Sequence, residues 1–340
     1  MRASALACGA AARLMKVGLL GTMVWDTIHA RDVRNAPIEE WGGASYAFAA
    51  FAAAAPADWE VIPLVRVGSD LSDRALAFLH SMERLDLDRV RVVAEPNNRV
   101  ELRYVDEARR SERLSGGVSP WPWPVLEALV GDLDALYVNF ISGFEMELET
   151  AQRLRMRMHG PVYCDLHSLF LGVAAGGLRT PQPLDHWRDW LSCFDVVQLN
   201  EDELALLASA WGDPWEFAAQ TVGDMPRALL VTLAERGAAY VASAAFRPDP
   251  LAWREPGVGL KRPLAVPGAV RSGKVEARDV VERGDPTGSG DVWGATCFAR
   301  LLAGDALEDA MAAANEAGAR NAAHRGATGL YDFLQGRIAK

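Results

Sequence analysis

From residue 16 onward, short apolar runs alternate with longer amphipathic segments along almost the whole chain. Continuous apolar runs of about four to eight residues are typical of strands covered on both faces, as in a parallel sheet. Their alternation with helical patterns predicts an α/β fold: a doubly wound, mostly parallel central sheet with helices on both faces. The predicted strands are residues 16–21, 61–67, 135–141, 161–165, 195–199, 228–233 and 239–243, and the predicted helices are residues 69–85, 151–159, 201–210, 292–302 and 307–324.

Two polar stretches, residues 27–40 and 97–117, interrupt this pattern. Within the second, residues 99–104 (RVELRY) alternate polar and apolar side chains, which is typical of a strand with one exposed face. We therefore expect these stretches to form a small antiparallel sheet outside the main one. At the start of the predicted helix 69–85, Ser69 or Asp70 is expected to act as the N-cap, because both residue types accept hydrogen bonds from the first helical turn.

The charge and cysteine content restrict the partners of this chain. With 35 Lys and Arg against 45 Asp and Glu, the net charge is −10 and no basic block is present. Nucleic acid or a membrane surface is therefore not the expected partner, because binding phosphates needs clustered basic residues. No apolar run approaches the roughly 20 residues of a membrane span. The four scattered cysteines have no metal-ligand spacing, which indicates reduced thiols and a cytoplasmic location.

The N-terminal residues 1–14 are rich in alanine and are expected to form a disordered extension rather than a signal peptide, because Arg13 interrupts their short apolar run. The first predicted strand begins directly after Met15, so Met15 is an alternative start of the protein. The expected domain covers residues 15–334 and is followed by a tail over residues 335–340.

The sequence GDPTGSGD at residues 284–291, directly before a predicted helix, indicates an anion site. Small residues ahead of a helix let backbone N–H groups converge on a phosphate, and the helix dipole adds to the attraction. The lysine of the P-loop pattern GxxxxGK[ST] is absent. Because the loop ends in a carboxylate instead, Asp291 is a candidate general base for a hydroxyl that attacks a bound phosphoryl group. The alternative is that Asp291 is an ordinary N-cap.

At this motif the chain resembles the ribokinase-like, or PfkB, carbohydrate and nucleoside kinases, whose C-terminal signature is D-[TP]-x-G-A-G-D. The match is DPTGSGD, with Ser289 in place of Ala. The resemblance implies that Asp291 is the catalytic base and that the amides of Gly288, Ser289 and Gly290 form the anion hole. It also implies a small β-sheet lid, here residues 27–40 and 97–117, and allows a homodimer through that lid.

Further similarities follow in the order of the family. GTMVWD at residues 21–26 resembles the motif whose aspartate, here Asp26, binds substrate hydroxyls, and Gly42-Gly43 resembles the glycine pair beside the sugar. Thr232 and Gly237 match the VTLGxxG motif near the nucleotide phosphates. Asp285 and Thr287, with the loop at residues 324–327, resemble a monovalent-cation (K⁺) site near the nucleotide.

Asn200-Glu201-Asp202-Glu203 follows a predicted strand as the family's N-x-x-E does, and the resemblance assigns Asn200 and Glu203 to Mg²⁺ and its waters. Mg²⁺ prefers one or two carboxylates together with waters and phosphate oxygens, and strand ends are where open α/β sheets bind ligands. The alternative is structural: an acid-rich, capped first turn of the following helix.

The positions that recognise the sugar depart from the family. Ala47 stands where sugar kinases carry a sugar-binding asparagine, and Val24 replaces another. In the D-x-N-x-R segment of some members only Asp165 is kept, followed by His167. Asp165 and His167, like Asn139 and Glu145, follow strand ends and are candidates for the substrate pocket, with ordinary polar loops as the alternative.

These motifs predict a kinase that moves the γ-phosphoryl group of Mg·ATP to a hydroxyl of a small sugar or sugar derivative. The substrate is expected between Asp26, Gly42-Gly43 and Asp291, with Asp165 and Asn139 nearby. The missing asparagine leaves a nucleoside kinase of the same superfamily open. A catalytically silent small-molecule sensor is a third reading.

Overall fold

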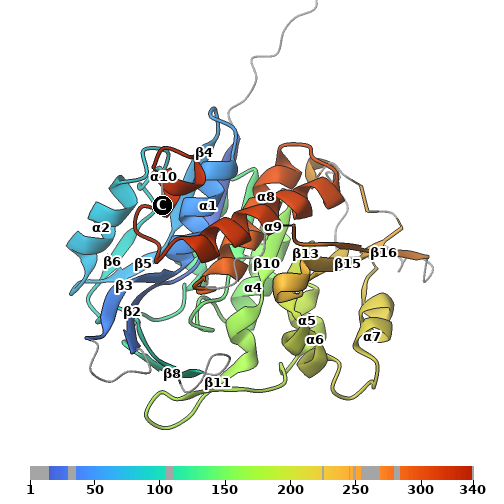
Figure 1. The fold of residues 1–340 in the computed structure, drawn as a ribbon, viewed down its shortest axis with the longest axis horizontal. Helices are drawn as coiled ribbons and strands as arrows, with labels where there is room; N and C mark the ends of the chain where they lie inside the picture. Colours follow the sequence, from blue (N-terminus) through green and yellow to red (C-terminus); the bar gives the residue numbers. More distant parts are fainter. Residues whose placement is uncertain are drawn as a thin grey trace, which may run out of the picture.

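The computed structural model describes residues 15–29, 36–104, 110–223, 226–244, 246–247, 250–253, 269–278 and 284–338. Within them an eight-stranded sheet forms the centre of the molecule, in the order β16-β15-β14-β13-β10-β9-β1-β4 (Figure 1). The extension expected over residues 1–14 lies outside the described residues. The strands of the sheet are β1 (Lys16–Leu20), β4 (Glu60–Leu64), β9 (Ala135–Asn139), β10 (Val162–Asp165), β13 (Val196–Asn200), β14 (Ala228–Thr232), β15 (Ala238–Ser243) and β16 (Val270–Val275).

The central sheet is parallel from β4 to β14, and β15 and β16 are added antiparallel at one edge. The inner strands are buried on both faces, which is why their sequences are continuous apolar runs. The predicted doubly wound fold class is confirmed. One predicted strand, residues 61–67, is divided between β4 and the short β5 (Arg66–Gly68), which pairs with β6 (Arg91–Val93) outside the main sheet.

Helices cover both faces of the sheet and enclose two hydrophobic cores (Figure 1). None of the described helices combines the length and hydrophobicity that crossing a membrane would require. One core contains α1 (Ala44–Ala54), α2 (Ser72–His80), α8 (Ser289–Leu302), α9 (Leu307–Ala323) and α10 (Leu330–Leu334), and the other contains α3 (Trp123–Val130), α4 (Leu148–Arg157), α5 (Trp187–Leu191), α6 (Glu201–Leu207) and α7 (Pro214–Thr221).

Helix α1 was not predicted from the sequence, because its alanine-rich segment has no polar face and therefore no amphipathic period. In the structure α1 packs mainly against α8 and lies almost wholly inside the core. An apolar surface all round is what a fully enclosed helix requires.

A second sheet, the lid sheet, has the order β3-β2-β7-β8 and is formed by β2 (Met23–His29), β3 (Ile38–Gly43), β7 (Arg99–Tyr104) and β8 (Arg110–Ser115). The small additional sheet is thus confirmed, but the expectation that it is antiparallel is wrong at its centre. There β2 and β7 run parallel, because the chain crosses through β4 and α2 before it returns. The outer pairs β2–β3 and β7–β8 are antiparallel.

The predicted capping of helix 69–85 is also wrong. Helix α2 begins at Ser72, its N-cap is Leu71, and no side chain caps it. Asp70 instead accepts a hydrogen bond from Asn97 N at 2.7 Å and pairs with Arg99 Nη2 at 2.6 Å. Its carboxylate therefore fixes the start of lid strand β7 rather than the helix.

Candidate active site

The GSG segment forms the first turn of α8, at the carboxyl edge of the central sheet. Gly288 is the N-cap, with φ +75°, and the helix starts at Ser289 rather than at the predicted residue 292. Asp291 is the third helical residue, so the reading of Asp291 as the N-cap is wrong. The first N–H groups of a helix have no intrahelical acceptor, and here they belong to residues with small side chains or none. A Cβ atom placed on Gly290 would have no heavy atom within 4 Å, so this turn opens onto free space. This geometry suits an anion.

Three side chains hold the loop in place. Asn321 Nδ2 donates to Thr287 O at 2.9 Å and to Ser289 Oγ at 3.1 Å. Gln198 Nε2 donates to Gly290 O at 3.0 Å. The ring of Tyr46, from α1, fills the space beside Gly288, where a Cβ would lie 2.3 Å from the ring. Both its left-handed backbone and this close contact therefore require glycine at residue 288.

Asp291 is oriented by an amide from a neighbouring strand end. Asn139 Nδ2 donates to Asp291 Oδ1 at 2.8 Å, across 152 residues of sequence. Asn139 is buried at the end of β9, so a strand end of the central sheet fixes the amide that holds the carboxylate.

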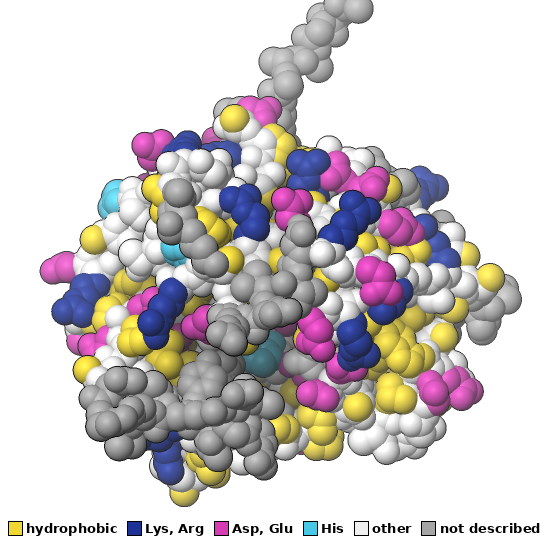
Figure 2. Space-filling model, viewed as in Figure 1, with side chains coloured by type: hydrophobic (Ala, Val, Ile, Leu, Met, Phe, Trp, Pro, Cys, Tyr) yellow, Lys and Arg dark blue, Asp and Glu magenta, His cyan; other side chains and the backbone are white. Residues whose placement is uncertain are grey.

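Asp291 lies on the wall of a cavity of about 610 Å³. Figure 2 shows a hollow near the middle of the viewed face, with acidic side chains and a histidine around it. The lining residues in the described chain include no Lys or Arg, and their charged side chains are mostly carboxylates. The structure brings these predicted site residues to the cavity: Asp165, Asn200, Glu203, Thr232, Gly237, Thr287, Gly288, Ser289, Gly290 and Asp291. It does not bring Asp26, Gly42, Gly43, Asn139 or Asp285 to its lining.

Asn200 and Glu203 form a capping box at the start of α6, so the structural alternative for this motif is realised. Asn200 Oδ1 accepts from Glu203 N at 2.9 Å, and Asn200 N donates to Glu203 Oε2 at 2.8 Å. Glu203 Oε1 also lies 2.8 Å from Asn200 Nδ2 and 2.6 Å from His167 Nδ1. Both oxygens of Glu203 are thus engaged within the protein.

Asp165 and Glu203 are buried beside the cavity, and the partly exposed His167 lies next to them. Burial lowers the pKa of His167, but the Glu203 carboxylate and its hydrogen bond outweigh that effect and raise the pKa to about 9. Burial, and then the nearby carboxylates of Glu203 and Asp291, raise the pKa of Asp165 to about 8. Asp165 Oδ2 also accepts from Gln198 Nε2 at 2.9 Å. Three carboxylates crowded into one site create an environment that favours cations.

Asp26 and the glycine pair lie together in the lid sheet, on β2 and β3. A Cβ on Gly42 would lie 1.9 Å from Asp26 Oδ2, so the absence of a side chain at residue 42 makes room for this carboxylate. Asp26 is buried. Gly43 directly precedes α1, and a Cβ there would lie 2.5 Å from Ile141 Cγ2. The lid sheet therefore contacts the loop that follows β9 and Asn139.

Around Asp285 the structure gathers buried oxygen atoms. Glu40 Oε1, Thr287 Oγ1 and Asn321 Oδ1 are buried with no hydrogen-bond partner among the described residues. Burial, followed by the Asp285 carboxylate, raises the pKa of Glu40, while Arg325 opposes the shift. The sequence analysis did not single out Glu40, whose position in a polar lid strand gives no signal. Buried oxygen atoms of this kind are the ligands that a hard cation prefers.

Thr232 and Gly237 flank the other side of the cavity. Thr232 ends β14 opposite Asn200, and the short helix η2 (Ala234–Arg236) follows it. Ala234 has φ +52°, in the left-handed region that favours glycine, at the position where the family motif has glycine.

Gln198 and Asn321 are the main site residues that the sequence analysis missed. The sequence could have indicated both, because each is a polar amide side chain among the apolar residues of a buried strand or helix. Arg179 was also missed. It is buried and begins the short strand β12 (Arg179–Pro181), which the sequence analysis did not predict.

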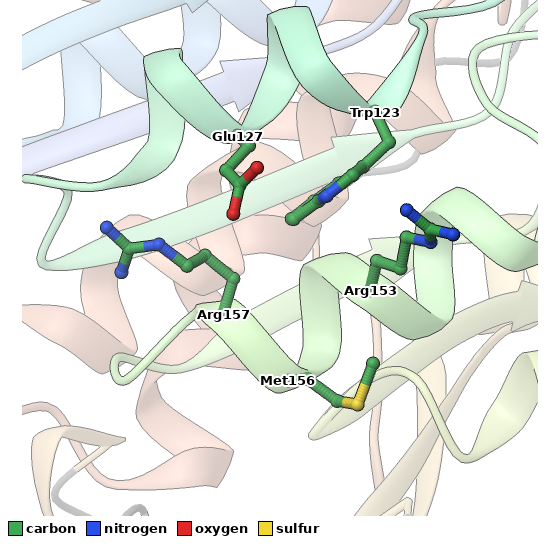
Figure 3. Close-up of a pocket in the computed structure, with 5 residues that line it drawn as sticks. All are labelled: Trp123, Glu127, Arg153, Met156 and Arg157. Atoms are coloured by element: carbon green, nitrogen blue, oxygen red, sulfur yellow. The ribbon is translucent and has the colours of Figure 1, made fainter.

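A second, shallow depression of about 450 Å³ lies between α3 and α4. Trp123 and Glu127 from α3 lie opposite Arg153 and Arg157 from α4 (Figure 3). It shares no lining residue with the main cavity and contains no predicted site residue.

Comparisons with known proteins show a matching sequence family and structures of similar fold. The family model described as pfkB family carbohydrate kinase matches residues 60–332. No curated protein sequence matches the chain. Among solved structures, Arabidopsis thaliana ribokinase complexed with ribose and ATP has 15% identity and a TM-score of 0.66, over 95% of this chain and 99% of that chain.

A Burkholderia thailandensis nucleoside kinase in complex with inosine has 15% identity and a TM-score of 0.67, over 95% of this chain and 97% of that chain. A pyrophosphate-dependent kinase in the ribokinase family, complexed with a pyrophosphate analog and myo-inositol, has 16% identity and a TM-score of 0.68, over 94% and 98%. At these identities the likeness shows a shared fold.

Proposed function

Because this chain belongs to the pfkB family of carbohydrate kinases, we propose that it transfers the γ-phosphoryl group of Mg·ATP to a hydroxyl of a small sugar or sugar derivative. Asp291 is the general base in this proposal. The observation that carries it is the position of Asp291 in the first turn of α8, on the cavity wall, with its carboxylate oriented by Asn139 at 2.8 Å.

Different residues of this chain bind the phosphates, hold the acceptor and accept its proton. The amides at the start of α8 bind the phosphate oxygens, since the cavity lining has no Lys or Arg in the described chain. Asp291 accepts the proton of the attacking hydroxyl as the oxygen–phosphorus bond forms and the bond to ADP breaks. Asp26, in the lid sheet, is the candidate for holding the acceptor by its hydroxyl groups.

The donor set fits Mg²⁺ bound together with a nucleotide. No group of three or more His, Cys, Asp or Glu side chains in the described residues is arranged to hold a metal alone. Asn200 and Glu203 would therefore hold Mg²⁺ through its waters, with phosphate oxygens completing the coordination, and both oxygens of Glu203 are already engaged. When bound, Mg²⁺ neutralises phosphate charge in a site where carboxylates predominate.

The test is a phosphorylation screen with two donors and three classes of acceptor. Purified protein is incubated with MgATP or with magnesium pyrophosphate, together with sugars, sugar phosphates or nucleosides. Phosphorylated acceptor is measured by mass spectrometry. Turnover of a sugar with ATP supports the proposal. Turnover with pyrophosphate but not with ATP contradicts the proposal that ATP is the phosphoryl donor. Tight binding of a small molecule without turnover of any acceptor indicates a sensor instead.

A nucleoside acceptor is the second candidate, and one observation favours it. Ala47, at the position where sugar kinases carry a sugar-binding asparagine, lies inside α1 and is only 1% exposed. That position therefore cannot offer a hydrogen bond to a sugar. Preferential turnover of a nucleoside over free ribose in the same screen would establish this alternative.

A further inference from the structure

A hairpin outside the main sheet covers the edge of the lid sheet. It consists of β11 (Leu171–Val173) and β12 (Arg179–Pro181), and it directly follows the short helix η1 (His167–Phe170), which carries His167 (Figure 1). Leu114 N of β8 donates to Gly177 O at 2.8 Å, and Arg113 Nη1 donates to Gly176 O at 2.9 Å. The edge strand of the lid is thereby attached to a segment rooted at the active site.

Arg179 makes this attachment specific. Its side chain is 2% exposed, and Nη1 donates to Glu112 Oε1 of lid strand β8 at 2.6 Å. Nη2 donates to Ile141 O at 3.0 Å and to Ser142 O at 3.2 Å. One planar guanidinium thus joins the lid sheet to the loop after β9, a geometry that the single ammonium of lysine cannot reproduce.

The loop at residues 141–143 connects the Arg179 contact to the site around Asp291. The buried Glu145 carboxylate accepts hydrogen bonds from the N–H groups of Ile141 at 2.9 Å, Ser142 at 2.7 Å and Gly143 at 3.1 Å. These hydrogen bonds hold the loop in one conformation. It begins two residues after Asn139, which orients Asp291, and Ile141 borders Gly43 of the lid.

We propose that Arg179 is a positioning residue that holds the lid sheet against the 141–143 loop and so aligns the acceptor hydroxyl with Asp291. This inference rests on the proposed function. If the attachment is lost, water reaches the bound nucleotide more easily. The γ-phosphoryl group is then transferred to water, and the products are ADP and inorganic phosphate in place of ADP and phosphorylated acceptor.

The experiment compares R179M, E112Q and the double variant with wild type, and uses R153Q as the control. Arg153 pairs with Glu149 at 2.6 Å on the exposed side of α4, so R153Q removes an ion pair of the same length that involves neither the lid sheet nor residues 141–143. We expect R179M and E112Q to raise the acceptor KM at least about tenfold and the share of inorganic phosphate among the products, with the ATP KM within about threefold. The double variant should be no worse than R179M. A parallel loss for both substrates without extra phosphate would overturn the proposal.

Hydrogen exchange provides a readout that needs no acceptor. In R179M and E112Q, amides of β8 and of residues 141–143 should exchange faster than in wild type, while R153Q should match wild type. Unchanged exchange in both segments would overturn the proposal. E112Q keeps the size of Glu112 and removes the negative charge that pairs with Arg179, so it serves if R179M fails to fold. Faster exchange in a protein that phosphorylates no acceptor would uphold the attachment while the proposed function fails.

Discussion

At the scale of single residues, Asp291 and Asn139 form the contact on which the proposed chemistry depends. The carboxylate lies in the first turn of α8 and the amide at the end of β9. The hydrogen bond between them holds the Asp291 carboxylate in one orientation, and a general base must be oriented toward the proton that it accepts.

We expect D291N to lower turnover by about 10²- to 10⁴-fold, the usual loss when a positioned general base is removed. ATP binding, measured by calorimetry, should stay near the wild-type value because the amides of the loop remain. The control is D309N, since Asp309 occupies the first turn of α9 as Asp291 does that of α8. Turnover within threefold of wild type in D291N would refute the assignment.

Ala234 offers a stability prediction at the same scale. Its φ of +52° is unfavourable for a residue with a Cβ. We expect A234G to raise the free energy of unfolding by about 0.5–1 kcal/mol, because the relief of about 1–2 kcal/mol of backbone strain exceeds the extra freedom of glycine in the unfolded chain. Urea unfolding measures this. A303G, at a position with φ −74°, should instead lose stability.

At the scale of elements, the active site depends on how α1 packs against α8. Tyr46, in the first turn of α1, fills the space beside Gly288, so the apolar helix that the sequence pattern did not reveal also supports the anion-binding loop. The same packing explains why two glycines of one loop should respond differently to substitution.

We expect G288A to lose both stability and activity, since a Cβ would lie 2.3 Å from the Tyr46 ring and the backbone is left-handed. The backbone alone costs about 1–2 kcal/mol. G290A should keep the wild-type stability, because its Cβ would meet no atom within 4 Å, but should weaken ATP binding by protruding into the cavity. Thermal unfolding and ATP titration separate the two. Equal stability of both variants would contradict the packing argument.

At the scale of the whole molecule, the crowded carboxylates and the histidine paired with Glu203 link the stability of the fold to pH. The pKa of Asp165 is raised from 3.8 to about 8, so its neutral form is stabilised in the folded protein and stability falls as the pH rises through this range. The pKa of His167 is raised from 6.5 to about 9, so the stability it contributes is present below pH 6.5 and is lost as the pH rises through about 9.

Because both groups lose stabilising free energy as the pH rises, we expect the metal-free protein to unfold more easily at pH 9.5 than at pH 7. Urea unfolding at the two pH values measures the difference. D165N, which cannot ionise, should reduce the dependence on pH, and D309N should leave it unchanged. Stability that is constant or rises between pH 7 and pH 9.5 would contradict the prediction.

The sequence alone determined the α/β class, the buried strands and the GSGD loop. Hydrophobic periodicity and a run of small residues before a helix are local properties, so they can be recognised without knowing which segments meet. Local patterns failed to predict α1, because this helix has no polar face. They also predicted the wrong cap at Ser69 or Asp70, because Asp70 accepts a hydrogen bond from Asn97 N instead.

Only the tertiary structure decided which side chains act together. A parallel sheet brings the carboxyl ends of strands that are far apart in sequence to one edge, and so Asn139 reaches Asp291 and Gln198 reaches Gly290. The ion pair of Arg179 with Glu112 joins a hairpin to the lid in the same way. Such contacts depend on strand order and on crossings of the chain, and neither property is present in any local stretch of residues.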